Sequence, residues 1–452
     1  LRKGVIGMAG GTFTSQNKVR PGVYIRFRSN SGMGLTVGSR GTVAICEPLS
    51  WGPVAQVMEI EAGEDMTPYT GYDITAPQNR FLNEIFKGTN RTAAPNRVLL
   101  YRPTATSSAK ASATISPLTV TAKYPGSRGN GISVVVTELT EPEDTFTVAT
   151  VVDGEIVDQQ TAKTVEELAA NEWVTFSGTG ALAANTGMAL TGGEDGTVQS
   201  AAYSAFLAAI EPYPFDVLIY DGNDSTVQDA FEAFIERIAN DSGVYAQLVA
   251  AELTNPDSRF VVNVNSGVTL EDGTALTPQQ VTWWAGGALA GARYNESLTY
   301  AQYPGAVDVS PKRTSSGYEQ ALSSGEFVLF ADNGVVKVEQ DINSLVTYTT
   351  DITKVYHKNR VIRLLNTIAN DIYRQFSDGY IGVVNNNEAG QMQFKSAIVG
   401  YLLDIQANEG IQNLDAGDVT VEAGTEIDAI VVALAIQPVD SVEKVYVTIT
   451  LN

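Results

Sequence analysis

The residue types that most often carry catalysis are scarce in this 452-residue chain, which has one histidine, His357, and one cysteine, Cys46. A Ser-His-Asp or Cys-His arrangement would have to use His357, and no nucleophile-elbow glycine pattern is present. A zinc site needs three or four nitrogen or sulfur ligands, which one His and one Cys cannot supply. The sequence therefore predicts no catalytic residue and no metal site.

Glycine-rich segments could cradle phosphate groups, but here each precedes an expected strand. Residues 32–34 (GMG) and Gly38 are followed by strand-like residues 42–46, and residues 129–131 (GNG) by residues 132–136. A dinucleotide site needs a helix N-terminus at this point, and the chain has no G-x-x-x-x-G-K-[ST] motif. We therefore expect no nucleotide and no other cofactor.

Acidic residues are numerous, and the net charge is −22. Residues 129–291 hold 24 acidic and three basic residues, a composition typical of a solvated acidic face. Residues 221–224 (DGND) lack EF-hand spacing and indicate a turn before a helix. The negative charge argues against nucleic-acid binding, which needs a basic surface.

One basic cluster occurs in a predicted helix that starts near His357. It contains Lys354, Lys358, Arg360, Arg363 and Arg374. Apolar residues recur at helical spacing between positions 361 and 376, so one face should pack inward and leave the cationic face free. That face is either an ordinary solvated surface or a contact surface for another protein.

The elements at the two ends of the chain are strand-like. Residues 442–451 alternate, with Val445, Val447, Ile449 and Leu451 on one face. Near the start, residues 23–27 (VYIRF) form a second alternating run that contains Val23, Tyr24, Ile25 and Phe27. Chain ends usually fray unless a sheet receives them, so both runs need partner strands.

Charge favours pairing of these two ends. Residues 1–46 carry seven basic residues and no acidic one, whereas residues 404–452 carry nine acidic residues and only Lys444. We expect the N-terminal arm to pair with the C-terminal domain, either within one chain or between copies. Pairing between copies would use different donor and acceptor surfaces, and would therefore build a ring or a helical filament.

Between the ends, the pattern predicts an α/β (α+β) multidomain protein. An N-terminal arm spans residues 1–22, and a middle α/β domain combines residues 23–104 and 197–345. A small-residue linker near residues 104–116 opens an inserted small all-β domain, residues 105–196. An α/β C-terminal assembly domain, residues 346–452, has two helices and the closing strands.

Several segments resemble tail sheath proteins of contractile bacteriophages and phage-tail-like bacteriocins of the Gram-positive prophage type. They are residues 8–14 (MAGGTFT), 19–25 (VRPGVYI), 124–131 (YPGSRGNG), 190–196 (LTGGEDG) and 438–446 (PVDSVEKVY). The resemblance spans essentially the whole chain, and its motifs are structural. Because the resemblance begins at Met8, we expect Met8 to be the natural start and residues 1–7 to be sequence upstream of it.

The resemblance implies a structural subunit rather than an enzyme. Copies would polymerise around a tail tube as a helical sheath of stacked rings joined by exchanged terminal strands, and would contract to drive the tube through a target cell envelope. The partners implied are further copies, the tail tube protein, and the baseplate and tail terminator proteins. Lys358, Arg360 and Arg363 would contact the tube.

The implied location is a virion or a phage-tail-like particle that is made in the bacterial cytoplasm. We expect no direct membrane insertion, because no window approaches the eighteen apolar residues that a span needs. The alternative function is a β-rich adhesin or receptor-binding module of a phage particle, which would be monomeric or trimeric.

Overall fold

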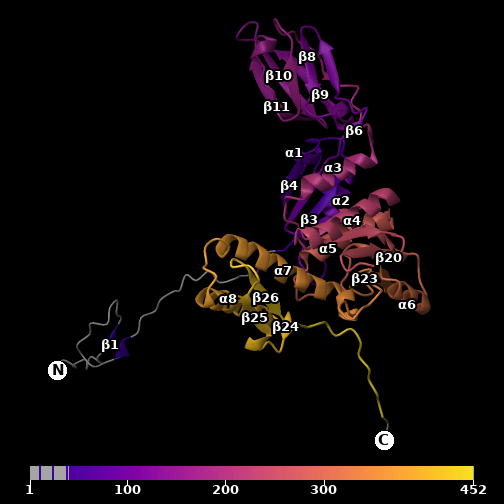
Figure 1. Cartoon of the computed structure of the whole chain (residues 1–452). Coiled ribbons are helices and arrows are strands. Elements are labelled where there is room, and N and C mark those ends of the chain that lie inside the picture. The colour runs from indigo at the N-terminus through magenta and orange to yellow at the C-terminus, as the bar shows by residue number, and fades with distance from the viewer. Residues whose placement is uncertain (1–9, 12–22, 25–36, 39, 451–452) are drawn as a thin grey trace, which may run out of the picture.

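The computed structural model describes residues 10–11, 23–24, 37–38 and 40–450. Its parts follow one another along an elongated molecule, with the inserted β domain at the end opposite to helices α7 and α8 (Figure 1). Of the expected terminal strands, Ile25, Phe27 and Leu451 lie outside the described residues. In the N-terminal arm, β1 (Gly10–Gly11) pairs in parallel with β2 (Val23–Tyr24), which directly follows the arm.

The middle of the molecule is a seven-stranded sheet with the order β21-β17-β16-β15-β3-β5-β4, in which only β4 runs antiparallel to its neighbour. Its strands are β3 (Thr42–Cys46), β4 (Val57–Glu61), β5 (Arg97–Tyr101), β15 (Val217–Tyr220), β16 (Gln247–Ala251), β17 (Val261–Val264) and β21 (Glu326–Phe327). The central strands are almost continuously apolar because helices cover both faces of the sheet.

Each face of this sheet has its own helices and its own core. One core contains side chains of α3 (Ser200–Ile210) and α4 (Ser225–Asp241). The other contains α2 (Arg80–Ile85) and α5 (Pro278–Gly291). Around these lie α1 (Thr67–Thr70), α6 (Ser315–Ser323), the sheet of β18 (Gly267–Leu270), β19 (Ala275–Leu276) and β20 (Ala306–Ser310), and the hairpin of β22 (Leu329–Asp332) and β23 (Val335–Val338).

The inserted β domain consists of two sheets that share one core. One sheet has the order β11-β10-β9-β13 and the other β12-β8-β7. Its strands are β7 (Ser112–Ile115), β8 (Leu118–Ala122), β9 (Ile132–Glu138), β10 (Phe146–Val152), β11 (Glu155–Ala162), β12 (Val174–Ser177) and β13 (Met188–Ala189). Short strands β6 (Ala105–Thr106) and β14 (Thr197–Val198) pair where the chain enters and leaves.

The β domain is also joined to the middle domain by Trp51, in the loop between β3 and β4. Trp51 is 1% exposed and belongs to the core of the β domain, with its ring 5.0 Å from that of Trp173 and 5.4 Å from that of Tyr124. Beside it, Arg102 donates hydrogen bonds to the carbonyls of Gly52 and Pro125. The two domains therefore share packed side chains as well as two chain crossings.

The C-terminal region has two helices and two small sheets. Helices α7 (Asn359–Gly379) and α8 (Glu388–Ala407) share a core with the strand residue Val419 and its neighbours. Strands β25 (Val419–Ala423) and β26 (Ile430–Leu434) pair antiparallel, as do β24 (Ile411–Gln412) and β27 (Gln437–Pro438).

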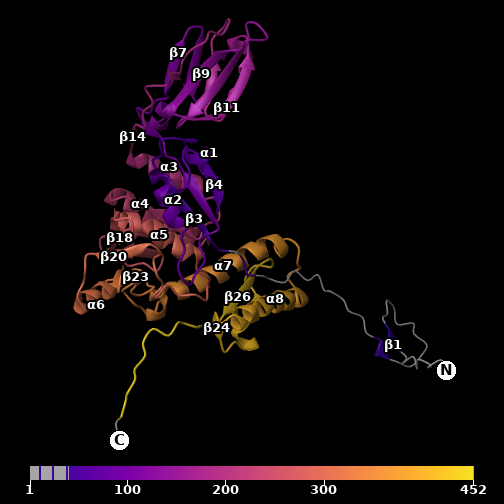
Figure 2. The same cartoon turned by 180° about the vertical axis from the view of Figure 1, so that it is seen from behind.

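The C-terminal end of the chain extends away from the other elements in both views (Figures 1 and 2). The strand expected over residues 442–451 is expected to need a partner, and described residues 442–450 form no strand within this single chain, so pairing with another copy stays a prediction. An extended backbone becomes a strand only when a partner supplies its hydrogen bonds.

A buried ion pair joins α7 to the middle domain. Arg363 Nη2 lies 2.6 Å from Asp341 Oδ2 and 2.7 Å from the carbonyl oxygen of Glu296, and the side chains of the pair are 0% and 1% exposed. The Asp341 carboxylate also accepts hydrogen bonds from the backbone N–H of Leu298 and the side-chain amide of Asn359, both at 3.0 Å. Nε and Nη1 of Arg363 have no partner among the described residues, so the guanidinium depends on Asp341.

We predict that Trp51→Ala destabilises the transition that includes the β domain by about 3–5 kcal/mol, since it removes a large side chain from a packed core. Urea unfolding followed by tryptophan fluorescence measures the change. Ile156→Ala, in the same domain but 61% exposed, is the matched control and should have little effect. Equal effects of both substitutions would show that Trp51 does not join the domains.

We also predict that Asp341→Asn lowers the free energy of unfolding by about 3–5 kcal/mol, because it leaves the Arg363 guanidinium buried without a counter-charge. The control is Asp332→Asn, which removes an exposed pair with Lys337 and should cost about 0–1 kcal/mol. Calorimetry of both variants tests this. A loss for Asp341→Asn no greater than that of the control would contradict the role given to the pair.

Candidate functional site

The C-terminal segment, residues 444–450, is a surface of the described chain that lacks a partner. Val445, Val447 and Ile449 are 75%, 74% and 82% exposed, and Tyr446, on the other face, is 91% exposed. No hydrogen bond or ion pair joins these residues to the rest of the described chain. Unpaired extended backbone together with exposed apolar side chains is what an added strand offers to a sheet.

Candidate acceptors for such a strand lie in the C-terminal domain. β25 and β26 form a two-stranded sheet, so each has one edge without a partner in the described chain. Exposed apolar residues stand at β26 and in the chain before it, with Val431 57% and Ile427 95% exposed. An added strand could therefore gain backbone hydrogen bonds and apolar contacts here.

The expectation of a free cationic face at the start of α7 is wrong for Lys358, Arg360 and Arg363. Arg363 is buried against Asp341, Arg360 is 8% exposed and donates to the carbonyl of Glu409 at 3.3 Å, and Lys358 pairs with Glu443. Helical spacing identified the apolar stripe but did not reveal that acidic groups of other segments occupy the polar side. Contact between this region and a tube stays a prediction, without the row of free charges on which it was based.

His357 is held as a structural residue. It ends the 3₁₀ turn Lys354–His357, and its Nδ1 lies 2.6 Å from the carbonyl oxygen of Leu345. Burial lowers its pKa. Cys46 is the last residue of β3 and lies in the core that contains α3 and α4, where burial raises the pKa of its thiol well above the ordinary value. The structure does not bring His357 and Cys46 together.

Two carboxyl groups meet at the carboxyl ends of neighbouring strands β3 and β15: Glu47, which sequence reasoning did not single out, and Asp221, which it assigned to a turn. Glu47 is buried, and its pKa is raised well above the ordinary range by burial and by the nearby Asp221. Burial also raises the pKa of Asp221, whose Oδ2 accepts a hydrogen bond from Trp283 Nε1 at 2.8 Å. This position is a common ligand site in α/β sheets. Here the carboxylate of Asp221 is already bound by the indole N–H of Trp283.

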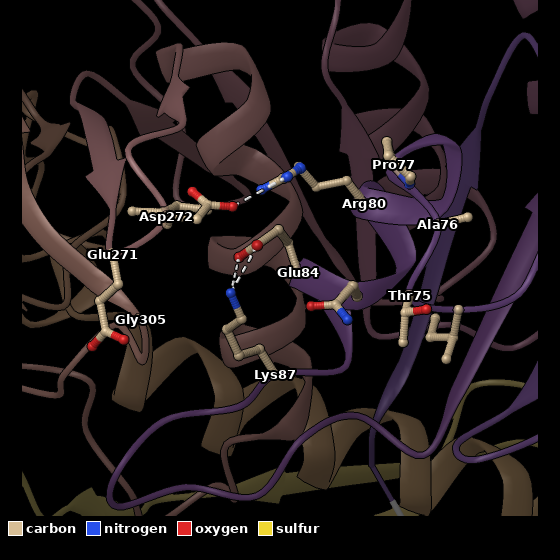
Figure 3. Close-up of a pocket in the computed structure, with 12 residues that line it drawn as sticks. Thr75, Ala76, Pro77, Arg80, Glu84, Lys87, Glu271, Asp272 and Gly305 are labelled. Carbon is tan, nitrogen blue, oxygen red and sulfur yellow. Dashed lines mark hydrogen bonds and ion pairs between the residues drawn. The ribbon is translucent and has the colours of Figure 1, made fainter.

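A polar cavity of about 310 Å³ lies between α2 and the loop after β18 (Figure 3). Its charged groups neutralise one another: Lys87 Nζ is 2.7 and 2.8 Å from the Glu84 carboxylate oxygens, and Arg80 faces Asp272 at 3.5 Å. Glu84 also accepts a hydrogen bond from the Tyr303 hydroxyl at 2.7 Å. Among the described residues that line it, only the Glu271 carboxylate has no charged partner, and no nucleophile lies beside a base.

Among the described residues, no group of three or more His, Cys, Asp or Glu residues could hold a metal ion. No helix in the described part of the chain is long and apolar enough to cross a membrane.

Four family models match consecutive parts of the chain. "Tail sheath protein Gp18 domain III N-terminal region" matches residues 40–102 and "Phage tail sheath protein beta-sandwich domain" residues 106–195. "Phage tail sheath protein central domain" matches residues 196–344 and "Phage tail sheath C-terminal domain" residues 351–452. Together they account for nearly all of the described chain.

Individual relatives agree along the whole length. The phage-like element PBSX protein XkdK of Bacillus subtilis is 35% identical over 477 residues, which cover 98% of this chain and all of the relative. The solved sheath tail protein of Desulfitobacterium hafniense is 42% identical with a TM-score of 0.85, and the alignment covers 94% of this chain and 99% of that one. The sheath tail protein of Listeria innocua is 33% identical with a TM-score of 0.79, covering 91% and 96%.

A more distant structure, the contracted helical sheath of the anti-feeding prophage, is 14% identical with a TM-score of 0.57, covering 96% of this chain and all of that one, and shares the fold. With its domain content, its sequence identity and its fold in agreement, the chain belongs to the phage tail sheath protein family.

Proposed function

We propose that this protein is the subunit of a contractile tail sheath, which polymerises helically around a tail tube and contracts to drive the tube through a target cell envelope. The observation that carries the proposal is the C-terminal segment, residues 444–450, whose apolar side chains are exposed and whose backbone has no partner in the described chain. The apolar side chains and the backbone groups of such a segment gain partners only in an assembly. The fold it shares with a sheath described as helical and contracted supports the same function.

Copies are joined, in this proposal, by exchange of terminal segments. The C-terminal segment of one copy adds to a small sheet in the C-terminal domain of another, and the basic N-terminal arm is attracted to the same acidic domain. Each backbone hydrogen bond contributes about 0.5–1.5 kcal/mol, and burial of Val445, Val447 and Ile449 adds about 25 cal/mol per Å² of apolar surface. Repeated over many copies, such contacts hold a lattice together.

The other partners follow from the same assembly. A sheath needs a tube inside it and a baseplate and terminator at its ends, so we infer contacts with those proteins and a place in a virion or tail-like particle. The energy for contraction would be stored in the packing between subunits. Subunits that stay joined by their exchanged segments can change their packing contacts without separating.

We infer that the inserted β domain is not needed for the lattice, since its acidic surface would repel further copies. Excising residues 105–196 would however expose Trp51, which packs in the core of that domain. An excised variant should therefore also carry Trp51→Ser.

We predict that deleting residues 444–452 abolishes polymers while leaving the melting temperature of the monomer unchanged, because described residues 444–450 make no bond to their own subunit. Deleting residues 8–27 should have the same effect on assembly. Sedimentation and electron microscopy of concentrated protein measure polymer formation. Ile156→Thr, which alters an exposed apolar residue of the β domain, is the control and should polymerise normally. Tubes formed by the C-terminal deletion would refute assembly by this segment.

A further inference from the structure

The carboxylate of Glu443 is the last attachment of the C-terminal segment to its own subunit within the described chain. Upstream, the backbone is held by pairing of β27 with β24 and by a hydrogen bond from the Val439 N–H to the Gly410 carbonyl at 3.0 Å. Glu443 follows as a side-chain attachment, and the described residues after it have none. Within the described chain, the bonds between this part of the chain and its own subunit therefore end at Glu443.

Three segments converge on this carboxylate. Thr299 Oγ1 donates to Glu443 Oε1 at 2.8 Å, Gln340 Nε2 donates to Oε2 at 2.5 Å, and the Lys358 ammonium pairs with Oε2. Thr299 follows α5, Gln340 follows β23, and Lys358 caps the start of α7. The side chains of Glu443 and Lys358 are 11% and 19% exposed, so these charge-assisted bonds are largely shielded from water.

The Thr299 hydroxyl links this attachment to the buried ion pair. It accepts a hydrogen bond from the Asp341 N–H at 3.0 Å, which leaves its own proton directed to Glu443. Asp341 in turn holds Arg363 of α7. The C-terminal segment therefore begins beside the buried ion pair that joins the middle and C-terminal domains.

We propose that Glu443 is a positioning residue for assembly: it fixes the point and direction at which the C-terminal segment leaves its subunit, and so presents that segment to a neighbouring copy. This inference rests on the proposed function. A segment attached at a fixed point samples a smaller volume, which raises its effective concentration at the acceptor and lowers the entropy lost on pairing. The glutamate of residues 438–444 (PVDSVEK), which overlap the start of the alternating run, thereby has a specific role.

The first test measures the anchor in the monomer. Spin labels at Thr448→Cys and at Gln320→Cys on α6 report the distance between the segment and the middle domain, and the native Cys46 is buried and should escape labelling. Glu443→Ala should broaden the distance distribution, and Glu443→Gln, which keeps an acceptor oxygen, should broaden it less. Glu236→Gln, an exposed glutamate on α4, is the matched control and should leave it unchanged.

The second test measures assembly of the full chain. Glu443→Ala should raise the protein concentration needed for polymers by about tenfold or more, as expected for loss of hydrogen bonds to a charged group. Lys358→Met removes the cation that pairs with Glu443 and should also raise the protein concentration needed for polymers. The double variant should need a concentration little higher than either single variant. Unchanged melting temperatures would show that folding is intact.

Unchanged distances or unchanged polymerisation in Glu443→Ala would overturn the proposal, even if deletion of residues 444–452 still abolished polymers. The opposite result, normal polymers from that deletion, would overturn the proposed function and with it the presentation role of Glu443. Broader distances together with a raised polymerisation threshold would support the anchor.

Discussion

The buried pair of Asp341 and Arg363 fixes how the C-terminal domain sits on the rest of the molecule. Both side chains are excluded from water, and the carboxylate also receives hydrogen bonds from Leu298 and Asn359. Removing one partner of such a pair leaves an uncompensated charge, so the two domains separate only at a large cost in free energy. The subunit body therefore behaves as a firm unit at this joint, and the freedom that a contractile lattice needs must lie elsewhere.

The C-terminal segment supplies this conformational freedom. The C-terminal segment begins at Glu443, beside the joint, and carries its apolar side chains into solvent. A rigid subunit whose C-terminal segment has no backbone hydrogen-bond partner is suited to a lattice in which neighbouring subunits rotate relative to one another while their strands stay paired. In the cavity beside α2, Lys87 pairs with Glu84 and Arg80 with Asp272, and the buried Asp221 accepts a hydrogen bond from Trp283.

Local signals predicted much of the fold. The sequence predicts a helix over residues 278–291, and the helix Pro278–Gly291 has these bounds because Pro278 starts it and Thr277 and Gln280 form a capping box. The dipeptide Asn333-Gly334 predicts a type I′ hairpin turn, and the two residues have the positive φ values of 52° and 78° that this turn requires. Apolar spacing also predicts a helix over residues 76–87. The helix observed there is shorter, Arg80–Ile85, and follows a 3₁₀ turn in which Asn79 donates to the Tyr72 and Asp73 carbonyls. Long-range pairing was not predictable: no spacing reveals that Asp341 and Glu443 neutralise Arg363 and Lys358.

The account depends most directly on where the C-terminal segment lies in the assembled sheath. A helical reconstruction of purified polymers by electron cryomicroscopy, at a resolution that traces the backbone, measures this. We expect residues 444–450 to leave their subunit at Glu443 and to form hydrogen bonds with a sheet in the C-terminal domain of another copy. A segment that folds back onto its own domain, or that contacts no sheet in the polymer, would contradict the account.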